Sequence, residues 1–199
     1  GVNLKLYNPA KKYETPGDMQ DIPRPIIGYM GTINSTRLDG ELLYQIISQR
    51  PDYSFVFTGP EDDIFRRNRI HSLKNAYFTG QKKVDELPAY IAAYDVCINP
   101  QMVNEITDGN YPLKIDEYLA MGKPTVATST HTMRHIFADH THLATNPEEW
   151  LSAIDRAVTE ADDKELAKQR IAFAETHSWG HSVKKIYDII DNFLKEKAT

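Results

Sequence analysis

The amino-acid sequence predicts an α/β protein: one sheet of about six parallel strands, with helices on both faces and extra helices at the C-terminal end. Two observations support this fold class. Short apolar segments alternate with segments of helical periodicity five times along the chain, which is the order typical of a parallel sheet. Hydrophobic residues make up 41% of the 199 residues and charged residues 26%, so the chain can build one core. The pattern is that of a Rossmann-like three-layer α/β/α sandwich.

The strands are expected where short apolar runs stop at glycine or proline, because these residues interrupt regular structure. In chain order the expected strands are 25–30, 53–58, 76–79, 95–99, 124–128 and 143–145. Gly31, Gly59, Gly80 and Pro100 end the first four of them. Residues 1–24 contain three prolines among polar residues. We therefore expect a linker or a loosely packed lead-in there, and a domain that covers 25–199.

Helices are expected between the strands, where apolar residues recur three or four positions apart. In chain order they are 38–49, 62–73, 84–94 and 112–121, then a turn or short helix at 131–139, then closing helices at about 147–160, 163–176 and 179–196. The last helix has one apolar face, which we expect to pack on the core. That face consists of Trp179, Val183, Ile186, Tyr187, Ile190 and Phe193.

Charge and cysteine content exclude several classes of protein. The formal net charge is -5, so the chain lacks the basic excess that binds nucleic acid. Cys97 is the single cysteine, which rules out an internal disulfide and a cysteine metal cage. No stretch approaches the roughly 20 apolar residues of a membrane span, and the first residues do not resemble a signal peptide. We expect a cytoplasmic protein whose sequence is cut from a longer chain.

The loops after the strands are the places to look for chemistry, because ligands of such sheets bind at the carboxyl ends of the strands. Gly31 and Thr32 follow the first strand and allow a ligand to approach the backbone. Neither a dinucleotide fingerprint nor a Walker loop is present. Arg37 follows closely and is suited to anionic oxygens. Its alternative role is a salt bridge with Asp39 or Glu41.

The segment after the fourth strand carries the most chemistry. Pro112 is expected to open a helix whose first-turn N–H groups and dipole suit an anion, and Lys114 adds a positive charge. Glu117 follows within two turns, and its two carboxylate oxygens suit the hydroxyls of a cis-diol such as ribose. The alternative is that Glu117 only favours the helix dipole.

Four histidines close to one another suggest a zinc site as a further hypothesis. They are His131, His135, His140 and His142. The segment lacks a companion acid motif, and histidines in loops are commonly surface residues, so we expect no metal. Thr128, Ser129 and Thr130 lie just before this segment and are candidates for hydrogen bonds to a ligand.

The motif Pro-x-Lys-x-x-Glu-Tyr-Leu-Ala-x-Gly-Lys-Pro at 112–124 resembles the donor-site helix of GT-B-fold glycosyltransferases. The similarity is greatest to the retaining glycosyltransferase family 4 (glycosyl transferases group 1). Other landmarks of that family are matched in the same order by residues 27–31, 37–39, 51–60, 75–80, 86–90 and 94–100. The resemblance covers about residues 25–195 and implies the C-terminal, donor-binding half of a GT-B fold.

The resemblance also implies roles for single residues. Glu117 would hold the ribose hydroxyls of a nucleoside diphosphate sugar. Arg37 and Lys114 would neutralise the leaving diphosphate, and these two cations with Glu117 form the implied catalytic set. The implied donor-binding residues are Gly31, Thr32, Thr79, Gly80, Gln81, Leu87, Asp108, Pro112, Leu113 and Glu117.

The sequence departs from the family pattern at two positions. Many members carry two glutamates with seven residues between them, and the position of the first is Gly109 here. Asp108 and Glu105 are the candidates to replace it. The family's frequent arginine after the glycine of the first loop is Thr32 here, so phosphate binding is expected to depend on the two cations named above.

The function implied is donor binding within a retaining hexosyltransferase of bacterial polysaccharide or glycoconjugate synthesis. The substrate would be a UDP- or GDP-sugar, without a metal or other cofactor. An N-terminal acceptor-binding half would be missing, and through it the protein would associate with the inner face of the membrane. The chain alone should bind nucleotide weakly and transfer no sugar. The alternatives are a GT-B-fold epimerase or phosphorylase half, and a non-catalytic nucleotide-binding or interaction domain.

Overall fold

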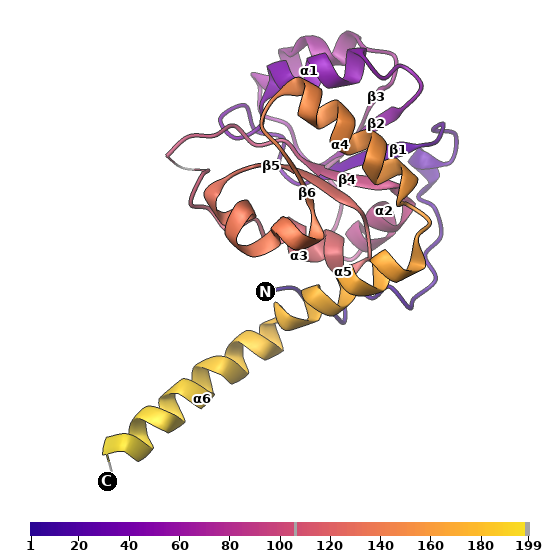
Figure 1. Ribbon diagram of the computed structural model, residues 1–199. Coiled ribbons are helices and arrows are strands. Elements are labelled where there is room, and N and C mark those ends of the chain that lie inside the picture. Colours follow the sequence, from indigo (N-terminus) through magenta and orange to yellow (C-terminus); the bar gives the residue numbers. More distant parts are fainter. Residues whose placement is uncertain (106, 198–199) are drawn as a thin grey trace.

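The computed structural model describes residues 1–105 and 107–197, and it confirms the predicted fold class. Across these residues, six parallel strands form one open sheet in the order β3-β2-β1-β4-β5-β6 (Figure 1). The strands are β1 Ile26–Met30, β2 Ser54–Thr58, β3 Ala76–Gly80, β4 Val96–Asn99, β5 Thr125–Thr128 and β6 His142–Ala144. The order changes direction between β1 and β4, and the crevice at the carboxyl ends of these two strands is where such sheets bind ligands.

Helices cover both faces of the sheet (Figure 1). One face carries α1 Gly40–Ser48 and α4 Pro147–Thr159, whose apolar residues belong to one buried cluster. The other face carries α2 Leu87–Ala93, α3 Leu113–Ala120 and α5 Lys164–Thr176, which contribute to a second cluster. The last helix, α6 Trp179–Lys197, extends away from the body.

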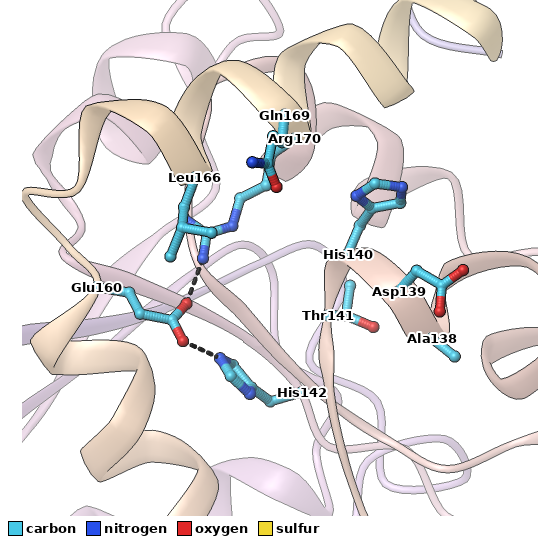
Figure 2. A pocket seen from close by; sticks show the side chains of 9 residues that line it. All are labelled: Ala138, Asp139, His140, Thr141, His142, Glu160, Leu166, Gln169 and Arg170. Carbon is cyan, nitrogen blue, oxygen red and sulfur yellow. Dashed lines mark hydrogen bonds and ion pairs between the residues drawn. The ribbon is translucent and has the colours of Figure 1, made fainter.

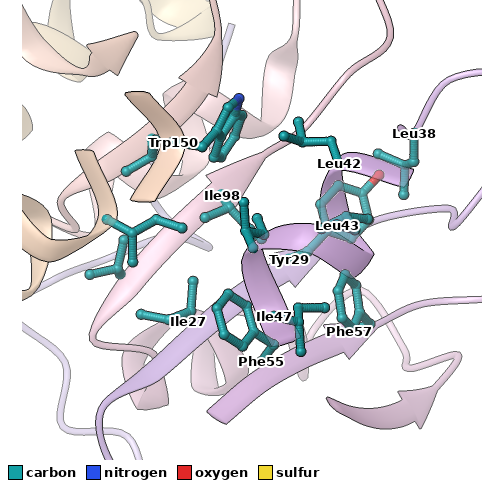
Figure 3. Close-up of a cluster of buried hydrophobic side chains, with 14 of the residues drawn as sticks. Ile27, Tyr29, Leu38, Leu42, Leu43, Ile47, Phe55, Phe57, Ile98 and Trp150 are labelled. Atoms are coloured by element: carbon teal, nitrogen blue, oxygen red, sulfur yellow. The ribbon is translucent and has the colours of Figure 1, made fainter. Parts of the chain in front are cut away.

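Successive residues of each strand enter opposite clusters, as the two-residue period of a strand requires. Ile27 and Phe55 pack with α1 and α4, around the fully buried Trp150 (Figure 3). Ile26 and Val56 pack on the other side of the sheet. Every residue of β1, β2, β4 and β5 is buried. These strands are covered on both faces, and this is why they appear in the sequence as uninterrupted apolar runs.

The predicted helix at 62–73 is wrong. Two short 3-10 helices, Phe65–Arg67 and Arg69–Ser72, take its place. Asn68 separates them in an extended conformation, and its side-chain oxygen accepts the N–H of Ile70 at 3.0 Å. This local bond competes with the helical hydrogen-bond ladder, as asparagine commonly does.

Other boundaries differ from the expected ones for local reasons. The helix expected at 38–49 begins only after Asp39, whose carboxylate caps it by accepting the N–H of Leu42 at 3.0 Å. The helix expected at 84–94 is reduced to α2, with Pro88 in its first turn. The segment expected as a turn or short helix at 131–139 is a π-helix, Met133–Phe137, followed by a 3-10 turn, Ala138–His140.

The N-terminal segment packs on the domain more closely than expected of a lead-in. Val2, Tyr7 and Met19 are each at most 3% exposed and belong to the cluster beneath α2, α3 and α5. The N–H of Val2 donates to His177 O at 3.1 Å, and Val2 O accepts the N–H of Trp179 at 3.3 Å. The first residues are thus fixed to the junction of α5 and α6. The domain boundary after residue 24 stays a prediction.

The expectation that the last helix packs on the core is wrong. Its apolar side chains, from Trp179 to Leu194, are 46–63% exposed. The described part of the chain folds no element against this face (Figure 1). None of the described helices combines the length and apolarity needed to cross a membrane.

Two glycines bring the loops after β1 and β2 into direct contact. Gly59 has φ of +148°, and a Cβ there would lie 2.0 Å from the carbonyl oxygen of Gly31. Gly31 in turn has φ of +134° and donates its N–H to Thr58 O at 2.9 Å. Because side chains rarely adopt this conformation and none fits here, both positions require glycine.

We predict that Gly59→Ala lowers the free energy of unfolding by about 3 kcal/mol, because the methyl group meets backbone atoms that cannot move aside. Urea denaturation followed by circular dichroism measures this. Gly17→Ala is the matched control, since a Cβ there meets nothing within 4 Å and the exposed residue lies in a short 3-10 turn. It should change stability by less than about 0.5 kcal/mol. Equal effects of the two substitutions would contradict the role given to Gly59.

Candidate functional site

Two adjoining hollows open at the carboxyl ends of β1 and β2, beside the start of α3. Their volumes are about 400 and 410 Å³, within the usual range of about 300–1,000 Å³ for small-molecule sites. Gly31, Thr32 and Lys114 line both. We call the hollow that contains Glu117 the carboxylate lobe and the one that contains Arg37 the arginine lobe. Together they form one cleft at the switch point of the sheet.

The start of α3 lies at the junction of the two lobes. The helix begins at Leu113, one residue later than predicted, and Pro112 occupies the N-cap position without a side-chain cap. Ile115 donates its N–H to Pro112 O at 2.9 Å. The N–H groups of Leu113 and Lys114 have no acceptor inside the helix, as at any helix start. They and the helix dipole favour an anion there.

Two adjacent acids on α3 have opposite environments. Asp116 is fully buried, and one of its oxygens accepts the hydroxyl of Tyr111 at 2.8 Å. Glu117 instead lines the carboxylate lobe. Burial raises the pKa of Glu117 to about 7, although the hydroxyl of Tyr7 and the charge of Lys114 oppose that rise. A carboxyl group with such a pKa in a cleft is a candidate for ligand binding.

Lys114 places a positive charge where the lobes meet. Its Nζ donates to the Tyr29 hydroxyl at 2.7 Å and lies 4.2 Å from the centre of that ring. The Tyr29 hydroxyl in turn donates a hydrogen bond to Thr32 O at 3.0 Å. A Cβ at Gly31 would come within 3.1 Å of Lys114 Nζ. The lysine is therefore held by β1 and α3 together, close to the backbone of the first loop.

Arg37 lines the arginine lobe, and the two acids that could have paired with it have other partners. Asp39 caps α1, and Glu41 forms an ion pair with Arg69 at 2.5 Å. Across the described residues, Arg37 has no ion-pair partner. The salt-bridge alternative is therefore wrong, and the guanidinium remains available for an anion in the cleft.

On the side of β3, Gln81 and Leu87 line the carboxylate lobe, but Thr79 and Gly80 do not. The Thr79 hydroxyl is bonded to that of Thr58 at 2.8 Å. The carbonyl of Gly80 accepts the N–H of Gly59 at 2.9 Å. Both residues thus support the wall of the cleft from behind, and their roles toward a ligand stay predictions.

The structure does not bring Asp108 into the cleft. Its carboxylate accepts the N–H of His131 at 2.7 Å and so ties the loop after β4 to the loop after β5. Glu105 is exposed on the same loop. Leu113 is 47% exposed and Pro112 is buried, and neither lines either lobe. Contact of Asp108 or Glu105 with a sugar stays a prediction.

Sequence reasoning missed several residues of the cleft. Tyr7 and Lys82 line the carboxylate lobe, and Tyr29 and Asn34 line the arginine lobe. Tyr29 lies on β1 and Asn34 follows the glycine loop. Their closeness to that loop could have identified them as candidate site residues. Tyr7 carried no such signal, because it lies in a proline-containing segment far from α3 in the sequence.

Another hollow, of about 260 Å³, lies beside the amino end of β6 (Figure 2). Its Glu160 carboxylate forms an ion pair with Arg170, and one carboxylate oxygen lies 3.0 Å from Nε2 of His142. Arg170 is only 7% exposed. These contacts join α5 to the edge of the sheet, which is a structural role.

The four histidines do not converge on one site, because they have different partners. His142 pairs with Glu160, and the ring of His140 packs on Phe173 at 4.1 Å between centroids. His131 and His135 pair with each other, at 4.2 Å between centroids, and are exposed. Among residues 1–105 and 107–197, no group of three or more His, Cys, Asp or Glu is arranged to hold a metal ion.

A parallel doubly wound sheet with an uncapped helix start and a carboxylate in its switch-point cleft defines a Rossmann-like class of α/β domain. Comparison with solved structures identifies the fold more closely. A glycosyltransferase from Rickettsia africae superimposes with a TM-score of 0.76 at 20% identity, covering 98% of this chain and 56% of that one. The C-terminal domain of a glycosyl transferase group 1 family protein (LpcC) from Francisella tularensis superimposes with a TM-score of 0.67 at 20% identity. It covers 88% of this chain and 97% of that domain. The fold is that of one half of a GT-B glycosyltransferase.

The chain belongs to the glycosyl transferases group 1 family, whose model matches residues 24–160. It is 26% identical over 185 residues to TuaH of Bacillus subtilis (strain 168), a protein named as a teichuronic acid biosynthesis glycosyltransferase. The match covers 90% of this chain and 46% of TuaH, so the chain spans about half the length of that relative. HepE of Anabaena, solved in complex with UDP, superimposes with a TM-score of 0.73 at 15% identity over 96% of this chain and 56% of that one.

We predict that Glu117→Gln stabilises the protein at pH 8. A carboxyl whose pKa rises from 4.5 to about 7 on folding binds more protons in the folded state, so stability falls as pH rises between these values. The neutral amide avoids this loss and should add about 2–3 kcal/mol at pH 8 and little at pH 4. Urea denaturation at both values measures the difference.

Glu149→Gln is the control with the opposite sign. The Glu149 carboxylate accepts hydrogen bonds from Thr145, which hold its pKa below the usual value. Its replacement should therefore lower stability at pH 8. If Glu117→Gln also lowered stability at pH 8, Glu117 would not be the buried carboxyl described here.

Proposed function

We propose that this chain is the donor-binding domain of a retaining glycosyltransferase and binds a nucleoside diphosphate sugar in the cleft between β1, β2 and α3. The observation that carries the proposal is the placement of Glu117 and Lys114, less than one turn apart on α3, in a single cleft with Arg37. A carboxylate and two cations match the diol and the diphosphate of such a ligand. The UDP complex of the related fold of HepE supports the choice of ligand.

The chemistry assigned to the site is stabilisation of the leaving group. As the bond between sugar and phosphate breaks, negative charge grows on the diphosphate. Lys114, held by Tyr29, and the N–H groups of Leu113 and Lys114 are fixed in advance around the proposed diphosphate position, so they lower the barrier without reorganising. Arg37 adds a second positive charge. Glu117 anchors the ribose and thereby orients the diphosphate toward these donors. No metal is required in this scheme.

Sugar transfer itself is assigned to a longer protein. The chain spans about half of TuaH, and the apolar face of α6 is exposed, as expected of a surface that packs on another part of a protein. We propose an N-terminal acceptor-binding half, a cytoplasmic location at the inner face of the membrane, and a role in bacterial cell-surface polysaccharide or glycoconjugate synthesis. The retaining outcome is tested on the full-length enzyme by NMR of the anomeric configuration of its product.

We predict weak binding of UDP or GDP by the isolated chain and its loss in Glu117→Ala, because this substitution removes the acceptor for the ribose hydroxyls. NMR titration of the chain with each nucleotide measures the affinities. Glu148→Ala removes an acid from the first turn of α4, away from the cleft, and should bind as the wild type does.

Absence of binding to both nucleotides would contradict the donor site and favour a non-catalytic interaction domain. The isolated chain should also release no sugar from a nucleotide sugar. Turnover by the purified chain would contradict the assignment of transfer to a two-part enzyme.

We predict that Arg37→Ala weakens UDP-glucose binding by about tenfold and uridine binding by less than twofold, since one charge-assisted contact to a phosphate is lost. Isothermal titration with both ligands measures this ratio. Arg66→Ala is the control, because Arg66 lies outside the cleft and pairs with Asp63 at 3.3 Å. Similar losses for uridine and UDP-glucose would show that Arg37 supports the fold rather than the phosphates.

A further inference from the structure

We infer that Tyr7 is a positioning residue for Glu117, so that the N-terminal segment forms part of the nucleotide site. The inference deepens the proposed function and rests on it. It assigns to Tyr7 the task of fixing one carboxylate oxygen, which leaves the other oxygen aimed at the ribose of the ligand.

Tyr7 meets Glu117 inside the carboxylate lobe. Both side chains line that hollow, and the phenol hydroxyl of Tyr7 is close enough to the Glu117 carboxylate to lower the pKa of Glu117. A carboxylate has about four acceptor positions on its two oxygens. A bond from Tyr7 to one of them would leave room for a diol, and it would remove the rotation that is otherwise lost on ligand binding.

Tyr7 is held by packing and by the backbone on either side. Its side chain is 3% exposed within the cluster beneath α2, α3 and α5. Its N–H donates to Asn3 O at 2.9 Å, in a turn that follows the attachment of Val2 to the start of α6. A tyrosine packed in this way is a fixed wall of the site, in contrast to a lid that a ligand displaces.

A second residue of the N-terminal segment, Asp18, contacts a residue that lines the cleft. Asp18, in the 3-10 turn Gly17–Met19, pairs with Lys82 at 2.6 Å and accepts the hydroxyl of Tyr90 at 2.8 Å. Lys82 lines the carboxylate lobe. The N-terminal segment thus braces the lobe at α3 through Tyr7 and at the loop after β3 through Asp18.

The groups around Glu117 determine how removal of the Tyr7 hydroxyl should change the pKa of Glu117. Lys114 lowers the pKa of Glu117, whereas burial and the charge of Asp116 raise it. The Tyr7 hydroxyl lowers it. Because Tyr7→Phe keeps the ring and its burial but removes the hydroxyl, it should shift the ionisation of Glu117 to higher pH.

The experiment compares UDP with 2′-deoxy-UDP as ligands of the wild type, Tyr7→Phe and Glu117→Ala. Tyr7→Phe should weaken UDP binding by about tenfold, the effect of one hydrogen bond to a charged group, and 2′-deoxy-UDP binding by less than threefold. Glu117→Ala should bind neither ligand measurably, because it removes the acceptor that Tyr7 is proposed to position. The pH at which UDP-glucose binding is half maximal should rise with Tyr7→Phe.

Tyr53→Phe is the matched control, because the Tyr53 hydroxyl also donates to a carboxylate, that of Asp155 at 3.1 Å, away from the cleft. It should leave both affinities unchanged. Equal weakening of both ligands by Tyr7→Phe would indicate a merely structural role. Tighter UDP binding would indicate that Tyr7 occupies the position of the ribose. Either result overturns the inference, as does an unchanged affinity.

The outcomes separate this inference from the proposed function. If the wild type binds UDP in a manner that depends on Glu117 and Tyr7→Phe does not alter it, only the role of Tyr7 is overturned. If the wild type binds neither UDP nor GDP, both the role of Tyr7 and the proposed function are overturned.

Discussion

The burial of a carboxylate at the switch point of the sheet is the constraint on which this site depends. The charged form of Glu117 would be more stable in water, and burial therefore raises its pKa to about 7. Packing holds it in the cleft: α3 continues into the core through Ile115 and Tyr118, both fully buried. The Tyr118 hydroxyl also accepts the N–H of Met30 at 2.8 Å, so α3 is locked to the end of β1. The packing of α3 therefore offsets the cost of holding the Glu117 carboxylate in the cleft.

The two cations have a different kind of support. Lys114 is fixed by Tyr29, and Arg37 extends from the loop that leads into α1. The helix start between the lobes has no side-chain cap, whereas Asp39, Asn146 and Asp163 cap α1, α4 and α5. The arginine lobe thus contains cations and no acid, whereas the carboxylate lobe also contains Glu117. This asymmetry suits a ligand with an anionic middle and a hydroxylated end.

The elements that could be predicted from sequence are those determined by the local spacing of apolar residues and by the glycine and proline residues that end them. The expected strands agree with the observed ones within a residue or two, because each is a short apolar run and the first four end at glycine or proline. Glu117 and Lys114 were found because they lie on one helix, where spacing determines the face. Failures came from contacts distant in sequence or from local competition. Asn68 broke an expected helix with its own side chain, and Tyr7 reached the cleft across more than a hundred residues.

The contact between Gly31 and Gly59 has a consequence for redesign of the pocket. Two loops that touch through their main chains form a single rigid unit, so neither can be lengthened or diversified alone. Attempts to change which ligand fits the cleft should leave that unit intact. The loop after β3 is the better place for sequence libraries, because Val84 is 65% exposed and lines the lobe without supporting the core.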